Sequence, residues 1–310
     1  MKKYLNAFIL QFLLISCSIA APLKNGFDLA NSTIPVAKIL SGGPPRDGIP
    51  SIDKPVFLSA DNADYLKPED RVLGIDFEGE TRAYPIRILN WHEIVNDEIK
   101  GKAVAVTYCP LCGSGIVYKA DSEGGPRKFG VSGLLYNSDV LLYDRETETL
   151  WSQILSKAIS GKLVDTKLEV IPSSHTSWQV WKKNHPYTKV LSNDTGFKRD
   201  YQRSPYGTYE RDVSIYFPLE FKSKKYHPKE RVLGISLKGQ LKVYPFAELA
   251  KTPGSRLNDI FAGEHLTVEF DSENRDGQIK DSSGKILPSM NTFWFAWYAF
   301  HPDTLIYKSE

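Results

Sequence analysis

A repeat within the chain constrains the fold more than any other feature of the sequence. The segment 68–75, with the pattern Pro-x-x-Arg-Val-Leu-Gly-Ile, returns at 228–235, a shift of 160 positions (228 minus 68). The dipeptide Tyr-Pro at 84–85 returns at 244–245 with the same shift. Each copy is typical of a strand, a glycine-containing turn and a returning strand. The sequence therefore predicts two structural units of similar design.

A second block repeats at a shorter shift. The pattern Thr-x-Trp-x-x-Trp-x-x-x-His-Pro-x-Thr spans 176–188 and 292–304, a shift of 116 positions (292 minus 176). Tryptophans three positions apart share one helix face, and His-Pro ends the helix, so His185 and His301 are expected to pack at helix ends. We therefore predict an α+β, β-rich fold, in which two unequal internal repeats of hairpin strands plus a Trp-bearing helix pack as one body.

The two copies differ in length, and this difference separates scaffold from function. Features shared by both copies are expected to be scaffold, whereas features of the first copy alone mark where function is expected. Those features are Trp91-His92-Glu93, the cysteine pair and an insertion from about 113 to 174. The predicted organisation is a signal peptide (1–21), a linker or irregular loop (22–55), a long repeat with the cysteines (56–192), a connector (193–223) and a short repeat without cysteines (224–310).

The only close cysteine pair lies at 109–113, in the sequence Cys-Pro-Leu-Cys-Gly. Proline sets a turn and glycine after the second cysteine permits a positive φ, so both sulfurs can face one point, as in a metal knuckle. In the second copy the corresponding strand ends at Asp271, with no cysteine after it. The pair therefore belongs to the part of the chain in which function is expected.

The N-terminus is typical of a targeting signal. Two lysines precede an apolar run at 5–15 that is too short for a convincing membrane span. Residues 14–17, Leu-Ile-Ser-Cys, resemble a bacterial lipobox in which Cys17 would carry lipid, whereas Ser-Ile-Ala before Ala21 resembles an ordinary cleavage site. Both interpretations predict an extracytoplasmic protein of the periplasm or cell envelope. Its only expected membrane contact is a lipid anchor at Cys17.

Charge excludes one class of partner. The chain has 39 basic and 37 acidic residues, a net charge of +2. This near balance gives no basis for proposing nucleic acid as a partner. The expected partners are a small molecule or a metal-delivery protein.

A glycine- and proline-rich segment precedes the repeats. Residues 41–50, Ser-Gly-Gly-Pro-Pro-Arg-Asp-Gly-Ile-Pro, are typical of an irregular loop. Two interpretations stay open for this segment. It is either a tether or a loop laid across the functional site, with Asp47 as a contact.

Two thiolates need further ligands to hold a metal, because a closed structural zinc site has four. His92 is the expected third ligand, since it occurs in the first copy only and precedes the strand that leads to Cys109 and Cys112. Soft ligands outside the cytoplasm favour copper, with zinc as the alternative. The sequence therefore predicts an open Cys2His-type site with a role in redox chemistry or metal handling.

Three further residues are candidates for catalysis beside such a metal. Glu93 is expected to lie outside the ligand sphere and to orient the imidazole. Asp139 and Tyr136, both in the insertion, are expected to face the open position. The sequence does not decide between an enzyme, a carrier and a binding module.

Two metal-free interpretations of the cysteine pair stay open. In an oxidising compartment the pair can cycle as a disulfide. The Gly-Ser-Gly that follows at 113–115 indicates a turn and a strand, unlike the helix start of a thioredoxin. A structural disulfide closing so small a loop would contribute only about 2 kcal/mol. The alternative function is therefore a thiol–disulfide redox or ligand-binding module in which Cys109 and Cys112 form a disulfide.

Five ordered motifs resemble a known family. They lie at 42–50, 90–97, 107–114, 129–139 and 150–153. They are similar to the bacterial and archaeal domain of unknown function 3179 family, from about residue 40 to the C-terminus. The resemblance implies that the Trp-His-Glu, Cys-Pro-Leu-Cys and Ser-Gly-x-x-Tyr-Asn-Ser-Asp segments characterise the group. It implies no substrate, so the functional interpretation depends on the repeat and the cysteine pair.

Overall fold

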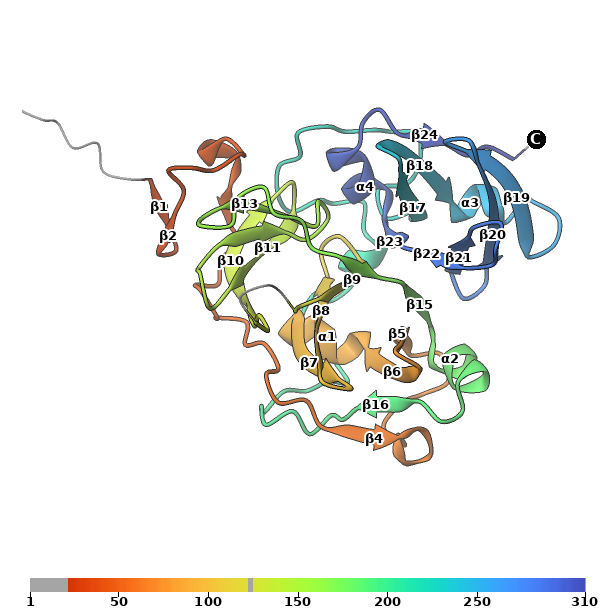
Figure 1. The fold of residues 1–310 in the computed structure, drawn as a ribbon, viewed down its shortest axis with the longest axis horizontal. Coiled ribbons are helices and arrows are strands. Elements are labelled where there is room, and N and C mark those ends of the chain that lie inside the picture. Colours follow the sequence, from red (N-terminus) through yellow and green to blue (C-terminus); the bar gives the residue numbers. More distant parts are fainter. Residues whose placement is uncertain (1–21, 122–124, 310) are drawn as a thin grey trace, which may run out of the picture.

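The strands form five sheets, each of four or five strands, and one short two-stranded ribbon near the N-terminus (Figure 1). The computed structural model describes residues 22–121 and 125–309. The predicted signal peptide, including Cys17, lies outside the described residues. None of the helices in the described ranges is both long and apolar enough to cross a membrane.

We number the sheets I to V and give their strands in spatial order. Sheet I contains β15 (Ser173–Ser177), β5 (Arg71–Phe77), β6 (Glu80–Pro85), β16 (Lys189–Leu191) and β4 (Phe57–Ser59). Sheet II contains β14 (Val170–Ile171), β9 (Ser114–Lys119), β8 (Lys102–Cys109) and β7 (Ile94–Ile99). Sheet III contains β13 (Lys157–Ser160), β12 (Leu150–Ser152), β11 (Asp139–Asp144), β10 (Phe129–Tyr136) and β3 (Leu40–Ser41).

The remaining elements belong mainly to the C-terminal part of the chain. Sheet IV contains β23 (Met290–Phe293), β17 (Arg231–Leu237), β18 (Gln240–Pro245) and β24 (Leu305–Ile306). Sheet V contains β19 (Arg256–Phe261), β20 (Glu264–Asp271), β21 (Asp276–Lys280) and β22 (Ile286–Leu287). The N-terminal ribbon pairs β1 (Leu23–Lys24) with β2 (Phe27–Asp28). The helices are α1 (Ile86–His92), α2 (Trp178–Asn184), α3 (Phe246–Leu249) and α4 (Trp294–Phe300), with 3-10 turns at Val36–Lys38, Ala60–Asn62 and Tyr209–Arg211.

The five sheets follow one another around the body, as in a five-bladed β-propeller (Figure 1). The prediction of a β-rich fold with few helices is confirmed. The predicted unit of hairpin strands plus a helix is incomplete, because sheets I to IV also pair strands that are distant in the sequence. In sheet I, for example, β16 pairs in parallel with β6 and antiparallel with β4. Pairing between segments so far apart in the chain leaves no periodic signal in the sequence.

The registers of the strands confirm the internal repeat. In β5 and β6, Val72 faces Pro85, and in β17 and β18, Val232 faces Pro245. In each copy a strand leads directly into a Trp-bearing helix, β15 into α2 and β23 into α4. The first copy supplies sheets I and II and the second supplies sheets IV and V. The insertion in the first copy supplies most of sheet III.

A glycine in each copy makes room for a tryptophan of the following helix. A Cβ at Gly74 would lie 2.4 Å from the Trp181 ring, and one at Gly234 would lie 2.1 Å from the Trp297 ring. The histidine at the end of each helix packs on the same tryptophan, with ring centroids 4.0 Å apart at α2 and 4.4 Å apart at α4. The predicted packing role of the two histidines is confirmed.

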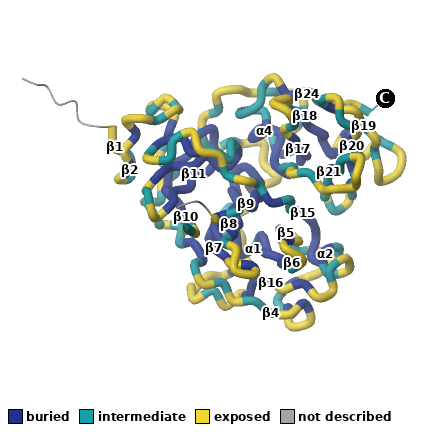
Figure 2. Tube along the Cα trace, in the orientation of Figure 1, coloured by how far each residue is buried: buried dark blue, intermediate teal, exposed yellow. Residues whose placement is uncertain are grey.

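The two copies interlock through their inner strands. β23 of the second copy lies beside β9 of the first, and β15 of the first lies beside β21 of the second. Figure 2 shows that β8, β9 and β11 are mostly buried, whereas exposed residues gather at the outer turns. Both sheets of each copy therefore pack against the other copy, sheet II with sheet IV and sheet I with sheet V, which makes one body of the two repeats.

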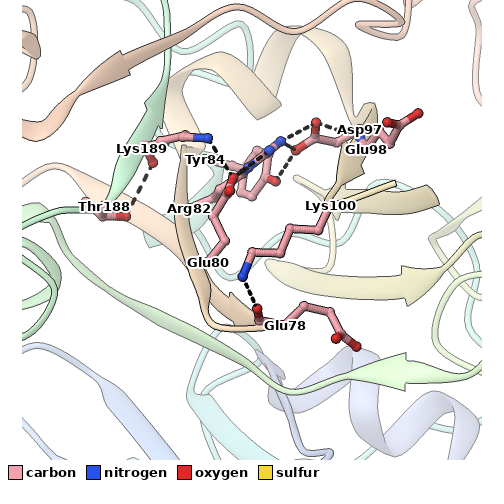
Figure 3. Close-up of polar contacts among 9 residues, drawn as sticks. All are labelled: Glu78, Glu80, Arg82, Tyr84, Asp97, Glu98, Lys100, Thr188 and Lys189. Atoms are coloured by element: carbon pink, nitrogen blue, oxygen red, sulfur yellow. Dashed lines mark hydrogen bonds and ion pairs between the residues drawn. The ribbon is translucent and has the colours of Figure 1, made fainter. Parts of the chain in front are cut away.

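A buried ion pair joins sheets I and II (Figure 3). The guanidinium of Arg82 on β6 donates to both carboxylate oxygens of Asp97 on β7. The Tyr84 hydroxyl donates to the same carboxylate at 2.5 Å. In the second copy Lys242 and Asp259 form the equivalent pair at 2.5 Å, again with a tyrosine hydroxyl on the carboxylate. Both copies thus use the same polar contact to join two sheets.

Replacing Asp97 with Ala is expected to destabilise the protein more than replacing Asp259 with Ala. The Asp97 and Arg82 side chains are 4% and 8% exposed, so the loss of Asp97 leaves a buried guanidinium that retains only its pair with Glu80, and costs about 3 kcal/mol. The second pair is more exposed, so its loss costs about 1 kcal/mol. Urea unfolding of the two variants at one pH measures the difference. Equal losses would contradict the role assigned to burial.

Candidate metal site

The cysteine pair lies on the turn of a β-hairpin. Cys109 ends β8, Ser114 begins β9, and the two residues pair directly across the hairpin. Gly113 has a φ of +61°, and a Cβ there would lie 2.8 Å from the Phe293 ring. Conformation and packing therefore both require glycine at this position. The expected turn and strand after the cysteines are confirmed.

A second hairpin turn brings a carboxylate to the thiols. Asn137 and Ser138 join β10 to β11 with φ values of +51° and +70°, a pair of left-handed residues typical of a type I′ turn. The Ser138 carbonyl oxygen lies 3.8 Å from Cys109 Sγ and 3.4 Å from Cys112 Sγ. Asp139 follows as the first residue of β11. The insertion thus delivers polar groups directly onto the cysteine turn.

Three side chains converge at this point. The sulfur atoms of Cys109 and Cys112 and a carboxylate oxygen of Asp139 all lie within 4.8 Å of one another. None of the three residues is more than 1% exposed, and both cysteines are free thiols. Thiolate sulfur and carboxylate oxygen are both established zinc ligands. The three residues together can hold one metal ion.

Oxygen atoms without hydrogen-bond partners surround the thiols. Asp139 Oδ2 accepts from Ile154 N at 3.0 Å, whereas Oδ1 is buried and has no hydrogen bond of ordinary geometry from the described residues, although the Cys109 thiol and the Val140 N–H lie close enough to lower the pKa of this carboxyl. The hydroxyls of Ser138 and Tyr209 lie near each other and are also buried, and within the same described ranges neither makes a hydrogen bond of ordinary geometry. Buried polar atoms normally have a partner. An unpartnered carboxylate oxygen beside two thiols therefore fits the binding of a cation.

Burial favours the protonated forms of the acidic groups in this site. It raises the pKa of Asp139 to about 8 and the pKa of Glu93 to about 7. Burial also raises the pKa of the Cys109 thiol, and burial together with the adjacent Cys109 raises the pKa of the Cys112 thiol further. A metal ion that binds here must displace these protons.

Tyrosines of the connector form one wall of the site. The Tyr206 hydroxyl donates to Glu93 Oε1 at 3.0 Å, where Glu93 is the left-handed residue that ends α1. Tyr209 packs in the same apolar cluster as the two cysteines. The Tyr201 hydroxyl lies 2.6 Å from Nε2 of His92. The connector therefore covers the features that distinguish the first copy.

The second copy holds the cysteine turn from the other side. Thr292 Oγ1 and Phe293 N both donate to the carbonyl oxygen of Cys112 at 2.9 Å. Arg231 Nη1 donates to the carbonyl oxygen of Gly113 at 2.6 Å. The copy without cysteines thus shapes the turn that carries them.

The structure does not bring His92 to the cysteines. Its ring is buried, with Nδ1 2.8 Å from Pro50 O and Nε2 2.6 Å from Tyr201 Oη. Both nitrogens are engaged, and the ring is not part of the group within 4.8 Å. The chain reverses at Glu93, whose φ is +56°, so the two neighbours face different surroundings. Glu93 bonds to Tyr206 and does not orient the imidazole.

Two other sequence candidates also engage different partners. The Tyr136 hydroxyl donates to Glu220 at 2.7 Å and is not part of the cysteine cluster. Asp47 accepts from the Tyr143 hydroxyl, on β11 of sheet III. The segment 41–50 therefore lies against sheet III, where β3 pairs with β10, and is not a free tether. Of the three acidic and phenolic candidates, Asp139 reaches the thiols.

Comparison of the two copies misses part of this site. Arg231 and Thr292 have equivalents in the first copy, Arg71 and Thr176, and so are predicted to be scaffold. Tyr209 lies in the connector, outside both copies. The tyrosine-rich composition of that connector is the signal that marks it as more than a linker. A residue that occurs in both copies can still contact the site of the other copy, and an alignment of the two copies does not reveal such a contact.

Comparisons with known proteins identify the family. A family described as "Protein of unknown function (DUF3179)" matches residues 46–276. No curated protein and no solved structure matches the chain. The match includes both hairpin turns of the site and most of the second copy. The expected family resemblance is confirmed.

Stability of the metal-free protein is expected to fall as the pH rises from about 6.5 to about 8. Burial raises the pKa of Asp139 to about 8, so in this window the folded protein holds a proton that the unfolded chain has lost. Each such carboxyl lowers the free energy of unfolding by at most about 1.4 kcal/mol per pH unit. Glu93, with a pKa of about 7, acts in the same direction. Urea unfolding at several pH values tests this trend.

The Asp139→Asn variant provides the matched comparison. Its stability should depend less steeply on pH than that of the wild type, because the amide does not titrate. Below pH 6.5 the buried histidines act in the opposite direction, since burial lowers the pKa of His92 and of His175. A wild-type slope that is unchanged in Asp139→Asn would contradict the assignment.

Proposed function

Because the chain belongs to the DUF3179 family, whose description assigns no function, we propose its function from the site itself. It is an extracytoplasmic protein that binds one soft metal ion through Cys109, Cys112 and Asp139. The observation that carries the proposal is the buried group of three ligands within 4.8 Å of one another, in which Asp139 Oδ1 has no hydrogen bond of ordinary geometry from the described residues. The targeting signal in the sequence supports the location.

The charge balance of the site supports metal binding. With a metal absent, the two thiols and the Asp139 carboxyl are favoured in their neutral forms by burial. A divalent ion replaces these protons with a charge that the thiolates and carboxylate neutralise. It also gives a partner to the buried oxygen that has none. One ion thus satisfies groups that would otherwise be buried at a cost.

The donor set favours zinc over copper. Two thiolates are soft ligands that suit both Zn²⁺ and Cu⁺, whereas a carboxylate is a hard ligand that suits zinc better. Two thiolates and one carboxylate leave one net negative charge around Zn²⁺ and two around Cu⁺. A buried site penalises the larger charge. Zinc is therefore the first candidate, and copper, favoured when His92 was the expected third ligand, becomes the second.

Three protein ligands leave one position of a tetrahedral metal open. Here the Tyr209 side chain borders the cysteines, and its buried hydroxyl lies near the Ser138 hydroxyl without a hydrogen bond of ordinary geometry among the described residues. Burial of the three ligands excludes a bulky substrate unless the connector moves. The arrangement therefore favours metal handling, or chemistry on a small molecule, over processing of a macromolecule.

Thiol–disulfide exchange is the alternative function, and the observed surroundings disfavour it. Exchange needs an accessible thiolate, often stabilised at a helix N-terminus. Cys109 and Cys112 lie on a hairpin turn, are buried, and have thiol pKa values raised by that burial. Both features slow attack on a partner disulfide.

The protein isolated from the cell envelope is expected to contain about one metal ion per chain. Mass spectrometry gives the metal content, and thiol titration of the same sample gives the oxidation state of the cysteines. Asp139→Asn should weaken metal binding by more than about 100-fold, because even loss of an outer contact typically costs about 10- to 100-fold.

Asp144→Asn is the matched control for Asp139→Asn. Both aspartates are buried and lie at opposite ends of β11, but Asp144 is fully occupied by Thr147 and Trp151. Asp144→Asn should therefore leave metal affinity unchanged, and His92→Gln should do so as well. Loss of affinity in His92→Gln with none in Asp139→Asn would reject the ligand set. Metal-free protein with a Cys109–Cys112 disulfide would favour the redox alternative.

A further inference from the structure

A second cavity lies behind the cysteine turn, on the side of the second copy. Its volume is about 650 Å³, within the range of small-molecule sites. The connector, the start of β17, helix α3 and the turn between β20 and β21 form its walls. Its residues do not include the proposed metal ligands. The cavity therefore requires its own explanation.

Positive charge dominates the lining of this cavity. Four cationic side chains face two carboxylates there: Arg211, Lys229, Arg231 and Arg275 against Glu210 and Glu230. The carboxylates are already engaged, one with the Arg231 guanidinium at 2.8 Å and the other with the backbone N–H of Ala247 at 2.7 Å. Within residues 22–121 and 125–309, Arg211, Lys229 and Arg275 form no ion pair. The cavity thus carries an excess of uncompensated positive charge.

Two of the cations are built into the protein. Lys229 and Arg231 are both 4% exposed. The Lys229 ammonium donates to the carbonyl oxygens of Tyr209, Asp212 and Ser214 but to no carboxylate. Its burial lowers its pKa to about 8. The charges of Asp212 and Glu210 offset only part of the cost of burying this ammonium, and an anion in the adjoining cavity would offset more of it.

The first copy provides an internal comparison for these charges. At the position equivalent to Lys229 it has Glu69 (229 minus 160), and at the position equivalent to Arg275 it has Gly113 (275 minus 162, the shift between Asp271 and Cys109). Arg231 is matched by Arg71. The additional cations are therefore specific to the second copy. Features that occur in one copy alone, such as the cysteines of the first copy, mark where function is expected. The additional cations therefore indicate a function of the second copy.

We propose that this cavity binds a small organic anion that carries phosphate or carboxylate groups. Arg211 lies in the connector and Arg275 in the turn between β20 and β21, and both line the cavity with guanidinium groups suited to such oxygens. The hydroxyl of Ser272, which has no hydrogen-bond partner among the described residues, is a further donor at the same wall. The Phe246 ring supplies an apolar surface for the carbon part of the ligand. None of the proposed metal ligands lines this cavity.

The cavity and the cysteine turn share one residue, Arg231. Its Nη2 pairs with Glu210 at the cavity, while its Nη1 donates to Gly113 O in the cysteine turn. An anion that draws the guanidinium away from Glu210 also acts on the segment that holds Cys112. The anion therefore has a physical route by which it can influence the metal site without contacting the metal.

Isothermal titration of the full protein with citrate and with inorganic phosphate tests the proposal. Sodium chloride of matched ionic strength is the blank. At least one of the two probes should show saturable binding. The double variant Arg211→Gln/Arg275→Gln should weaken that binding by at least about 10-fold, the effect of losing about 1.4 kcal/mol. Both side chains are exposed, so the variant should fold.

Arg203→Gln is the matched control, since this exposed arginine lies in the same connector but does not line the cavity. It should bind the anion as the wild type does. The double variant should keep the wild-type metal content, so a failure here is distinct from a failure of the metal proposal. Absence of saturable binding for both probes, or equal affinity in the wild type and the double variant, would overturn the anion site.

Discussion

Three hydrogen bonds across the boundary between the copies determine the shape of the functional turn. The carbonyl oxygens of Cys112 and Gly113 point into the second copy, where Thr292, Phe293 and Arg231 donate to them. Buried carbonyl oxygens need such partners. The turn therefore keeps its conformation only while both copies are docked. This junction between the copies therefore supports three features: the packing of the sheets, the geometry of the turn and the convergence of the proposed ligands.

The two copies have different duties in this arrangement. The first copy and its insertion supply every proposed metal ligand, from two separate hairpin turns. The second copy supplies the hydrogen-bond donors behind the turn and the positively charged cavity. The shared strands, glycines and tryptophans form the common scaffold. Function therefore lies in what each copy adds to that scaffold, and each copy adds a different chemistry.

The sequence predicts local features well and contacts between distant segments poorly. The registers of the repeated strands and the packing of the helix-end histidines follow from spacing alone. The cysteine pair is identified as a candidate site because it occurs in the first copy only. His92 was expected to be a ligand because it precedes the strand leading to Cys109. The chain reverses at Glu93, a left-handed residue, and the His92 ring therefore faces Pro50 and Tyr201 instead of the thiols. No pattern in the sequence reveals that reversal.

The hydrophobic periodicity of the sequence also does not predict which strands join in one sheet. Sheet I joins strands that lie at both ends of the first copy, and its edge strand β4 precedes the repeated pattern at 68–75. Arg231 and Tyr209 become part of the site only through packing between copies. Their roles follow from contacts that are distant in sequence. Asp139 was predicted as a candidate for catalysis, but its place among the ligands depends on the same kind of contact.

The wall of connector tyrosines would limit the rate at which the proposed metal ion exchanges. Ligands that are buried under Tyr206 and Tyr209 cannot meet a chelator or a donor protein until that wall opens. The frequency of local opening therefore sets an upper limit on the exchange rate, whatever the strength of the metal–sulfur bonds. Opening breaks the Tyr206–Glu93 contact and exposes the Glu93 carboxyl to water, so its pKa falls from about 7 towards the ordinary value of a glutamate and its proton is released. Opening, and with it exchange of the proposed metal ion, is therefore expected to become faster as the pH rises towards 7.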